Sequence, residues 1–141
     1  MEHMTSLKSW PEAAPRLIAV AAGRAPADCV IRQGKWVNVQ SREVLDGFDI
    51  AIAEGRFAAI APDLTSAIGP ETHVIEAQGR YMIPGLVDGH MHIESGMLTP
   101  AEFAAAVIPH GTTTMFTAPH EIANVLGLAG VRMMHDEAMA Q

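Results

Sequence analysis

The feature that most constrains this fold is the alternation of strand-like and helix-like patterns in the 60 residues after Tyr81. An apolar run over residues 86–92 and a β-branched, aromatic run over residues 112–117 predict two strands. The residues between these runs, and those from about 128 to 140, carry apolar side chains at helical spacing and predict two helices. Since an intervening helix lets consecutive strands pair in parallel, this half of the chain predicts a parallel sheet.

The first of these helices has a recognisable start. Thr99 is a capping residue, Pro100 suits the first helical position, and Glu102 lies three residues after the cap, which together are typical of a capping box. Two strand-helix units do not complete a domain, because a parallel strand needs cover on both faces and a (β/α)8 barrel takes about 250 residues. We therefore expect the domain that begins at residue 83 to be incomplete in this chain.

The preceding residues consist of short β-rich runs separated by glycine-containing turns. Gln33-Gly34 and Glu54-Gly55 lie between such runs, where glycine can adopt the positive φ of a tight turn, so we expect two hairpins. We expect residues 28–82 to form a small β-sandwich-like domain, and residues 1–27 to form a short helix, over about 17–22, followed by a linker. The β-rich runs are residues 29–32, 35–39, 48–53, 56–61 and 73–76.

Composition narrows the classes of function. The formal net charge is -7 and the 9 Lys and Arg residues are scattered, so no basic patch is available and we expect no nucleic-acid partner. Cys29 is the single cysteine, expected to be a small buried side chain, and no secretory leader pattern is present, which indicates the cytoplasm. No apolar stretch approaches the roughly 20 residues that span a bilayer, so we expect a soluble protein without a membrane partner.

The strongest candidate for a chemical site is His90-Met91-His92, at the end of the first predicted strand of the C-terminal half. Residues two apart on a strand point the same way, so both imidazoles can converge on one metal ion. An isolated pair of this kind also arises by chance or marks a polar strand end. Asp88 and Glu94 flank the pair, and barrel active sites lie at C-terminal strand ends, which favours the metal-site interpretation.

Several segments resemble one family. Residues 83–92, Ile-Pro-Gly-Leu-Val-Asp-Gly-His-Met-His, resemble the first barrel strand of the amidohydrolase superfamily of metal-dependent hydrolases. Residues 92–100 and 119–125 resemble motifs of the prokaryotic adenine deaminases within that superfamily. Residues 23–28 and the β-rich segment after them are similar to the opening of the same family. The resemblance covers nearly the whole chain after residue 15.

The resemblance implies an α/β fold in which residues 83–141 hold the first two βα units of a truncated (β/α)8 barrel. It implies hydrolysis of adenine to hypoxanthine and ammonia in purine salvage. It also implies a divalent metal, manganese or iron with zinc as a further option, in a two-metal centre to which His90 and His92 contribute ligands. The general base and the remaining ligands of the family lie on later strands, so no catalytic residue is expected in this chain.

Further polar residues match the family's motifs near the barrel mouth. They are expected to contact substrate or to support the metal ligands: Asp88, Glu94, Ser95, His120 and Glu121. Ala118 stands where the family usually has Asp, and Gly96 where it usually has a second Ser. Loss of a supporting carboxylate typically costs about 10- to 100-fold in metal affinity or activity. Three further histidines match no motif and are expected at the surface: His73, His110 and His135.

Alternatives to an active deaminase remain open at this point. The chain could be a non-catalytic truncated remnant, one half of a split enzyme completed by a C-terminal chain, or another amidohydrolase acting on a cyclic amide or nucleobase. A homo-oligomer is also compatible with the sequence. Because two histidines are fewer than the three protein ligands that catalytic zinc-type sites generally use, we expect the isolated chain not to deaminate adenine. We also expect its exposed strand edges to make it unstable alone.

Overall fold

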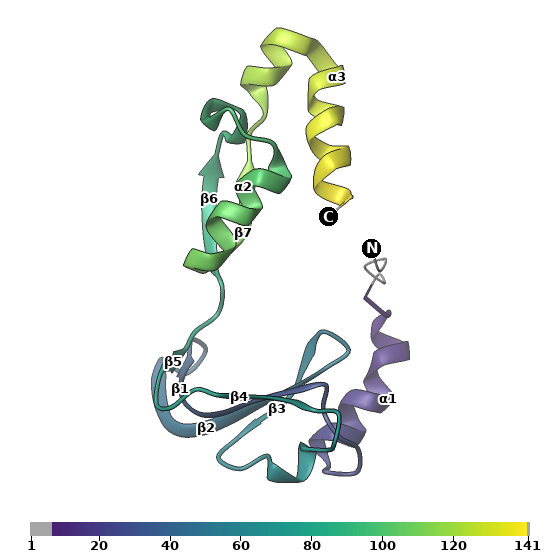
Figure 1. Ribbon diagram of the computed structural model, residues 1–141, viewed down its shortest axis with the longest axis vertical. Coiled ribbons are helices and arrows are strands. Elements are labelled where there is room, and N and C mark those ends of the chain that lie inside the picture. The colour runs from purple at the N-terminus through teal and green to yellow at the C-terminus, as the bar shows by residue number, and fades with distance from the viewer. Residues whose placement is uncertain (1–6, 141) are drawn as a thin grey trace. The chain divides into compact units, whose positions relative to one another are not determined.

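The computed structural model describes residues 7–140 and is a mixed α/β chain, as expected (Figure 1). It forms two compact units that meet between Pro84 and Gly85. The N-terminal unit is rich in β-structure, and the C-terminal unit alternates strands and helices. No helix among the described residues is long and apolar enough to cross a membrane.

The N-terminal unit contains a helix, α1 (Trp10–Ala21), and one five-stranded sheet. The strand order is β3-β2-β1-β4, and β5 pairs with β1 as well. The neighbours β1–β2 and β2–β3 are antiparallel, whereas β4 and β5 run parallel to β1. The strands are β1 (Cys29–Asn38), β2 (Glu43–Ala53), β3 (Arg56–Ala61), β4 (His73–Glu76) and β5 (Tyr81–Met82), and a 3-10 turn, η1 (Thr65–Ala67), precedes β4. The described residues of this unit therefore form a single sheet rather than the two layers of a sandwich.

The core of this unit lies between α1 and the sheet. Leu17 and Val20 of the helix are buried together with Val30 of β1 and Ala51 of β2. The small side chains on β2 and β3 leave room for the helix to pack closely on both strands. Cys29 is half-buried, and this burial, followed by the nearby Asp28 charge, raises the pKa of its thiol.

The prediction of a hairpin at Gln33-Gly34 is wrong. These residues lie inside β1, where a β-bulge shifts the register with β2 between Ile31 and Gly34. The amide of Gln33 donates a hydrogen bond of 2.8 Å to the carboxylate of Asp49, which is only 2% exposed. The other oxygen of Asp49 accepts a hydrogen bond of 3.1 Å from the amide of Leu64. The carboxylate thus supplies, from β2, the partner that the bulged backbone loses in the ladder.

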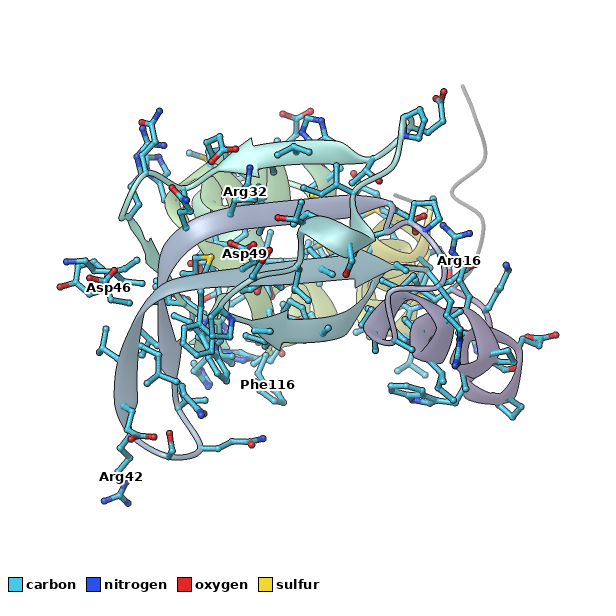
Figure 2. The ribbon with its side chains drawn as sticks, turned by 90° about the horizontal axis from the view of Figure 1, so that it is seen from below. Arg16, Arg32, Arg42, Asp46, Asp49 and Phe116 are labelled. Atoms are coloured by element: carbon cyan, nitrogen blue, oxygen red, sulfur yellow. The ribbon has the colours of Figure 1, made fainter. Side chains whose placement is uncertain are left out.

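The hairpin expected at Glu54-Gly55 is confirmed. It joins β2 to β3, and the two residues have φ values of +52° and +66°, which is the pairing that a two-residue type I′ turn requires. The first hairpin of the sheet lies elsewhere, between β1 and β2, with Arg42 at its tip (Figure 2). The bulge carries β1 past the glycine, so the turn is displaced to residues 39–42.

Helix α1 begins at Trp10, earlier than the expected helix over residues 17–22. Its start is fixed by Ser9, whose amide and hydroxyl donate hydrogen bonds of 2.9 Å and 2.6 Å to the carboxylate of Glu12. A carboxylate in the first turn also interacts favourably with the positive end of the helix dipole. Both effects stabilise a helix start that the apolar spacing alone does not reveal.

The C-terminal unit has two parallel strands, β6 (Leu86–Met91) and β7 (Thr112–Thr117), which confirms both expected strands and their direction. The connection between them contains η2 (Ile93–Gly96), helix α2 (Pro100–Val107) and η3 (Ile108–His110). Gly85 precedes β6, and a Cβ placed there lies 1.9 Å from the Thr113 hydroxyl oxygen. Only glycine therefore allows β6 to begin so close to β7.

The helices of this unit differ from expectation in detail. Helix α2 begins at Pro100 as expected, but the side chain of Thr99 makes no capping hydrogen bond, so the expected capping box does not form. Helix α3 (His120–Met139) begins well before residue 128 and is kinked at Gly127, where φ is +60° (Figure 1). His120 and Glu121 consequently lie on the first turn of a helix rather than in a loop.

Candidate metal centre

Parallel pairing brings polar residues together at the C-terminal ends of β6 and β7. His90 is the second-to-last residue of β6, and His92 follows the strand directly. His120 and Glu121 follow β7 across the short segment Ala118–Pro119. Because both strands run in the same direction, the two groups meet at one edge of the sheet. His92 lies at the centre of this arrangement, next to His90, His120 and Glu121.

His90 and His92 approach each other through their Nε2 atoms, which are 2.9 Å apart. The two rings meet edge-on, with centroids 4.7 Å apart and an interplanar angle of 76°. Two nitrogen ligands at metal distances of about 2.0–2.1 Å lie about 3 Å apart when the angle at the ion is near 90°. The separation of the two Nε2 atoms therefore fits two ligands of one ion.

A backbone carbonyl fixes the protonation of His92. Its Nδ1 atom lies 2.7 Å from the carbonyl oxygen of Ala118. A carbonyl can only accept a hydrogen bond, so Nδ1 carries the proton and Nε2 keeps its lone pair. Metal-binding histidines commonly donate their second ring nitrogen to an outer partner in this way. The contact therefore prepares His92 to bind an ion through Nε2.

His120 and Glu121 lie on the other side of His92. The ligand atoms of these three residues all lie within 4.8 Å of one another. The rings of His92 and His120 meet edge-on, with centroids 4.5 Å apart and an interplanar angle of 81°. Two imidazoles and one carboxylate are donors suited to a divalent transition metal. The chemistry and the spacing of this donor set thus fit a metal ion.

Glu94, in η2, connects the segment that follows β6 to the start of helix α3. Its Oε1 atom accepts hydrogen bonds from the amides of Glu121 at 3.2 Å and Ile122 at 3.4 Å. Since α3 begins after Pro119, whose side chain cannot cap a helix, Glu94 satisfies amides at the helix N-terminus from outside the helix. Desolvation acts to raise the pKa of Glu94, but these amides and its own, together with His92, hold it below the ordinary value.

One further contact joins this network, and one buried oxygen in it stays without a partner. The hydroxyl of Ser95 donates a short hydrogen bond to Oε2 of Glu121, which fixes one oxygen of that carboxylate. The second oxygen of Glu94, Oε2, is buried and has no hydrogen-bond partner among the described residues. An unpartnered buried carboxylate oxygen is costly, and a cation or a ligand hydrogen atom near it would remove that cost.

The carboxylate of Asp88, like that of Glu94, accepts a hydrogen bond from the backbone. Its Oδ1 atom accepts a hydrogen bond of 3.0 Å from the amide of His90. The structure thus joins Glu94, Ser95, His120 and Glu121 around His92, while Asp88 supports the strand end that carries His90. The three histidines without a motif are exposed, as expected: His73, His110 and His135.

The carbonyl of Ala118 is a functional group that sequence reasoning missed. Its side chain departs from the adenine deaminase pattern, so residue 118 drew attention only as a lost carboxylate. A backbone oxygen is present at every position, and only the parallel pairing of β6 and β7 shows that this one reaches His92. The signal for His120 was present in the sequence, because it follows the second strand as His92 follows the first.

Comparison with known proteins relates the chain to one family of enzymes. Residues 81–141 match the Amidohydrolase family. The adenine deaminase of Ruegeria pomeroyi is 74% identical over 97% of this chain, and that of Ruegeria sp. TM1040 is 72% identical over 100% of it. The crystallised L-hydantoinase (dihydropyrimidinase) of Arthrobacter aurescens shares 30% identity, with a TM-score of 0.51 over 66% of this chain and 21% of that one. This chain spans 23% of the length of each adenine deaminase.

The match over residues 81–141 relates the C-terminal unit to the Amidohydrolase family, which is metal-dependent and whose solved neighbours are (β/α)8 barrel proteins. Within that family, the chain corresponds to the N-terminal portion of an adenine deaminase. This confirms the family inferred from residues 83–92, 92–100 and 119–125, and it favours adenine deaminase over the other amidohydrolases considered.

Proposed function

We propose that this chain supplies part of the metal-binding site and part of the substrate pocket of an enzyme that hydrolyses adenine to hypoxanthine and ammonia. The observation that carries the proposal is the convergence of the Nε2 atoms of His90 and His92 at 2.9 Å. This convergence lies in a segment that is 74% identical to an adenine deaminase.

In this proposal, His90 and His92 hold a divalent ion, manganese or iron with zinc as a further option, in a two-metal centre. Such an ion, when bound, supplies a water molecule of lowered pKa for attack at the carbon that carries the amino group. Ala118 keeps the Nε2 lone pair of His92 available, and Asp88 holds the backbone of His90 in place. These contacts orient the donors before the ion arrives.

The remaining polar residues form the rim of the substrate pocket. Glu94 holds the N-terminus of α3, and Ser95 holds the carboxylate of Glu121. Hydrogen-bond donors and acceptors fixed in this way suit a purine, whose ring nitrogens accept hydrogen bonds and whose amino group donates them. The reaction also requires a residue that takes a proton from the attacking water as a general base and delivers it to the departing ammonia as a general acid, and we assign no residue of this chain to that role.

We also propose that β6 and β7 are the first two strands of a (β/α)8 barrel and that the N-terminal sheet is one layer of a sandwich. Two observations support this architecture. In β6, Leu86 and Val87 are 52% and 61% exposed, although apolar side chains of parallel strands are normally covered on both faces. In the N-terminal unit, an open apolar pocket of about 450 Å³ on the sheet is lined by Ile31, Trp36, Ile60 and Tyr81, among others.

Such uncovered surfaces imply that further chain, from the same polypeptide or from a complementing one, completes both domains. The isolated chain is accordingly expected to release no ammonia from adenine. The proposal is tested with a chimaera in which this chain replaces the matching segment of the Ruegeria pomeroyi adenine deaminase.

The chimaera, loaded with manganese, is expected to release ammonia from adenine at a rate within about tenfold of the parent enzyme, since one residue in four differs across the exchanged segment. Removal of the metal with a chelator is expected to abolish the activity, and restoring manganese is expected to recover it. A folded chimaera that binds metal but leaves adenine unchanged would contradict the proposal.

A further inference from the structure

We infer that His120 and Glu121 are metal ligands, which together with His92 form a three-residue site that this chain can assemble by itself. The inference deepens the proposed function, on which it rests for the presence of a metal. It differs from that proposal in the ligand set, because His120 and Glu121 were expected to contact substrate or to support the ligands.

The donor atoms of the three residues lie close enough together to bind one ion. The donor atoms of His92, His120 and Glu121 lie within 4.8 Å of one another, and they form the one such group of three or more among residues 7–140. Three protein ligands and a water molecule are the usual set of a catalytic zinc-type site. His90 and His92 alone would supply only two, and a site with three protein donors is expected to bind more tightly.

Hydrogen bonds to neighbouring residues orient the side chains of Glu121 and His92. Glu121 receives a hydrogen bond from the Ser95 hydroxyl on Oε2, which leaves Oε1 free to bind an ion. His92 donates from Nδ1 to the Ala118 carbonyl, so its lone pair is on Nε2, the atom that faces His90 Nε2. Outer partners of this kind fix metal ligands in place, so two of the three donors are already oriented for binding.

Helix α3, which carries His120 and Glu121, is anchored at its start by Glu94. Both His120 and Glu121 lie in its first turn, and the carboxylate of Glu94 accepts the amides of Glu121 and Ile122. This contact ties the helix end to the loop that follows His92. A substrate-binding role alone would not require imidazole, imidazole and carboxylate donors to be held so close around one point.

The arrangement also limits the role of His90. The Nε2 atom of His92 has one lone pair and can bind one ion, and His90 does not belong to the group of three. His90 Nε2 remains 2.9 Å from His92 Nε2, so it can join the same ion as an additional ligand. We therefore expect His120 to contribute at least as much to metal affinity as His90.

The test is the affinity of the full 141-residue chain for Zn²⁺, measured by competition with a chelating dye. Wild type is expected to bind one Zn²⁺. His120→Ala and Glu121→Gln are each expected to weaken binding by at least about tenfold, because a lost ligand costs no less than a lost outer partner. The matched controls are His135→Ala, from the same helix and with a side chain 70% exposed, and Glu102→Gln, from the first turn of α2.

Far-UV circular dichroism establishes that each variant is folded, and His120→Asn, which keeps a polar side chain at the helix start, replaces His120→Ala if the latter is not. Wild-type affinity in both His120→Asn and Glu121→Gln, or a wild-type chain that binds no Zn²⁺, would overturn the inference. Neither result depends on deaminase activity. An inactive chimaera with the expected binding pattern would instead refute the proposed function and leave this ligand set intact.

Discussion

The Nδ1 atom of His92 lies 2.7 Å from the carbonyl oxygen of Ala118, so the residue that follows β7 selects the ring tautomer of a residue that follows β6. The same segment is tied twice, since the amide of Ala118 donates a hydrogen bond of 2.9 Å to the carbonyl of Met91. The loss of a carboxylate side chain at residue 118 therefore leaves this support of His92 in place. The contribution of Ala118 to the site is made by its backbone.

Replacement of Ala118 by serine tests this conclusion. Ala118→Ser keeps both backbone hydrogen bonds, so the affinity of the chain for Zn²⁺ is expected to change by less than about threefold. His92→Asn is the contrasting variant, because asparagine can still donate to the carbonyl but lacks Nε2, and it is expected to lose at least about tenfold in affinity. A large loss in Ala118→Ser would show that the side chain at 118 matters more than its carbonyl.

The contact between Glu94 and α3 predicts a local effect on the helix. In Glu94→Ala the amides of Glu121 and Ile122 lose their acceptor, and the expected cost is about 1–2 kcal/mol, typical of a lost helix cap. Hydrogen exchange at these two amides should accelerate by about tenfold, since 1.4 kcal/mol corresponds to a factor of ten. Glu102→Ala, in α2, is the control, and equal exchange rates at residues 121 and 122 in wild type and Glu94→Ala would refute the capping role.

The buried carboxylate of Asp49 predicts a larger effect on the N-terminal unit. Asp49→Ala leaves the amides of Gln33 and Leu64 without their partner, and the free energy of unfolding is expected to fall by at least about 2 kcal/mol. Asp46→Ala, at an exposed site, is expected to change it by less than about 0.5 kcal/mol. Urea denaturation followed by tryptophan fluorescence measures both values, because Trp10 and Trp36 lie in this unit. Equal midpoints for the two variants would show that Asp49 does not hold the bulge.

Glu12 predicts a pH dependence of helix α1. The hydrogen bonds from Ser9, side chain first and then backbone, hold the pKa of Glu12 below its ordinary value of 4.5. A carboxyl group whose pKa is lowered on folding stabilises the fold above the unfolded pKa, and that contribution is lost as the pH falls through the folded pKa. Helicity measured by far-UV circular dichroism is thus expected to decline below about pH 4.5 in wild type and to decline less in Glu12→Gln. Identical pH profiles would contradict the role given to Ser9 and Glu12.

The sequence predicted those elements whose pattern is local. The apolar run of β6, the β-branched run of β7 and the start of α2 at Pro100 were all confirmed, as was the turn at Glu54-Gly55. Each depends on side-chain period or turn chemistry within a few residues. The family was predicted from motif order, and the comparisons confirmed it.

The parts that the sequence did not predict depend on contacts between distant residues. Gln33-Gly34 has the composition of a hairpin turn, but it remains within a strand because the carboxylate of Asp49 satisfies the bulged backbone. The first turns of α3 lie before the helix expected from about residue 128, and the amides at their start are satisfied by Glu94, about 27 residues earlier. The prediction of a capping box at Thr99 was also wrong. Here the local sequence pattern is present, but the side-chain hydrogen bond is not made.

The most direct test of the account measures kcat/KM for adenine in the manganese-loaded chimaera that carries this chain in the Ruegeria pomeroyi adenine deaminase. His92→Ala and His90→Ala are each expected to lower kcat/KM by at least about 100-fold, because their Nε2 atoms lie 2.9 Å apart and would hold the same ion, whereas His135→Ala is expected to leave it within about twofold. Ammonia release from adenine provides the readout. A His92→Ala chimaera as active as the His135→Ala control would show that the donor pair at the end of β6 is not part of the site.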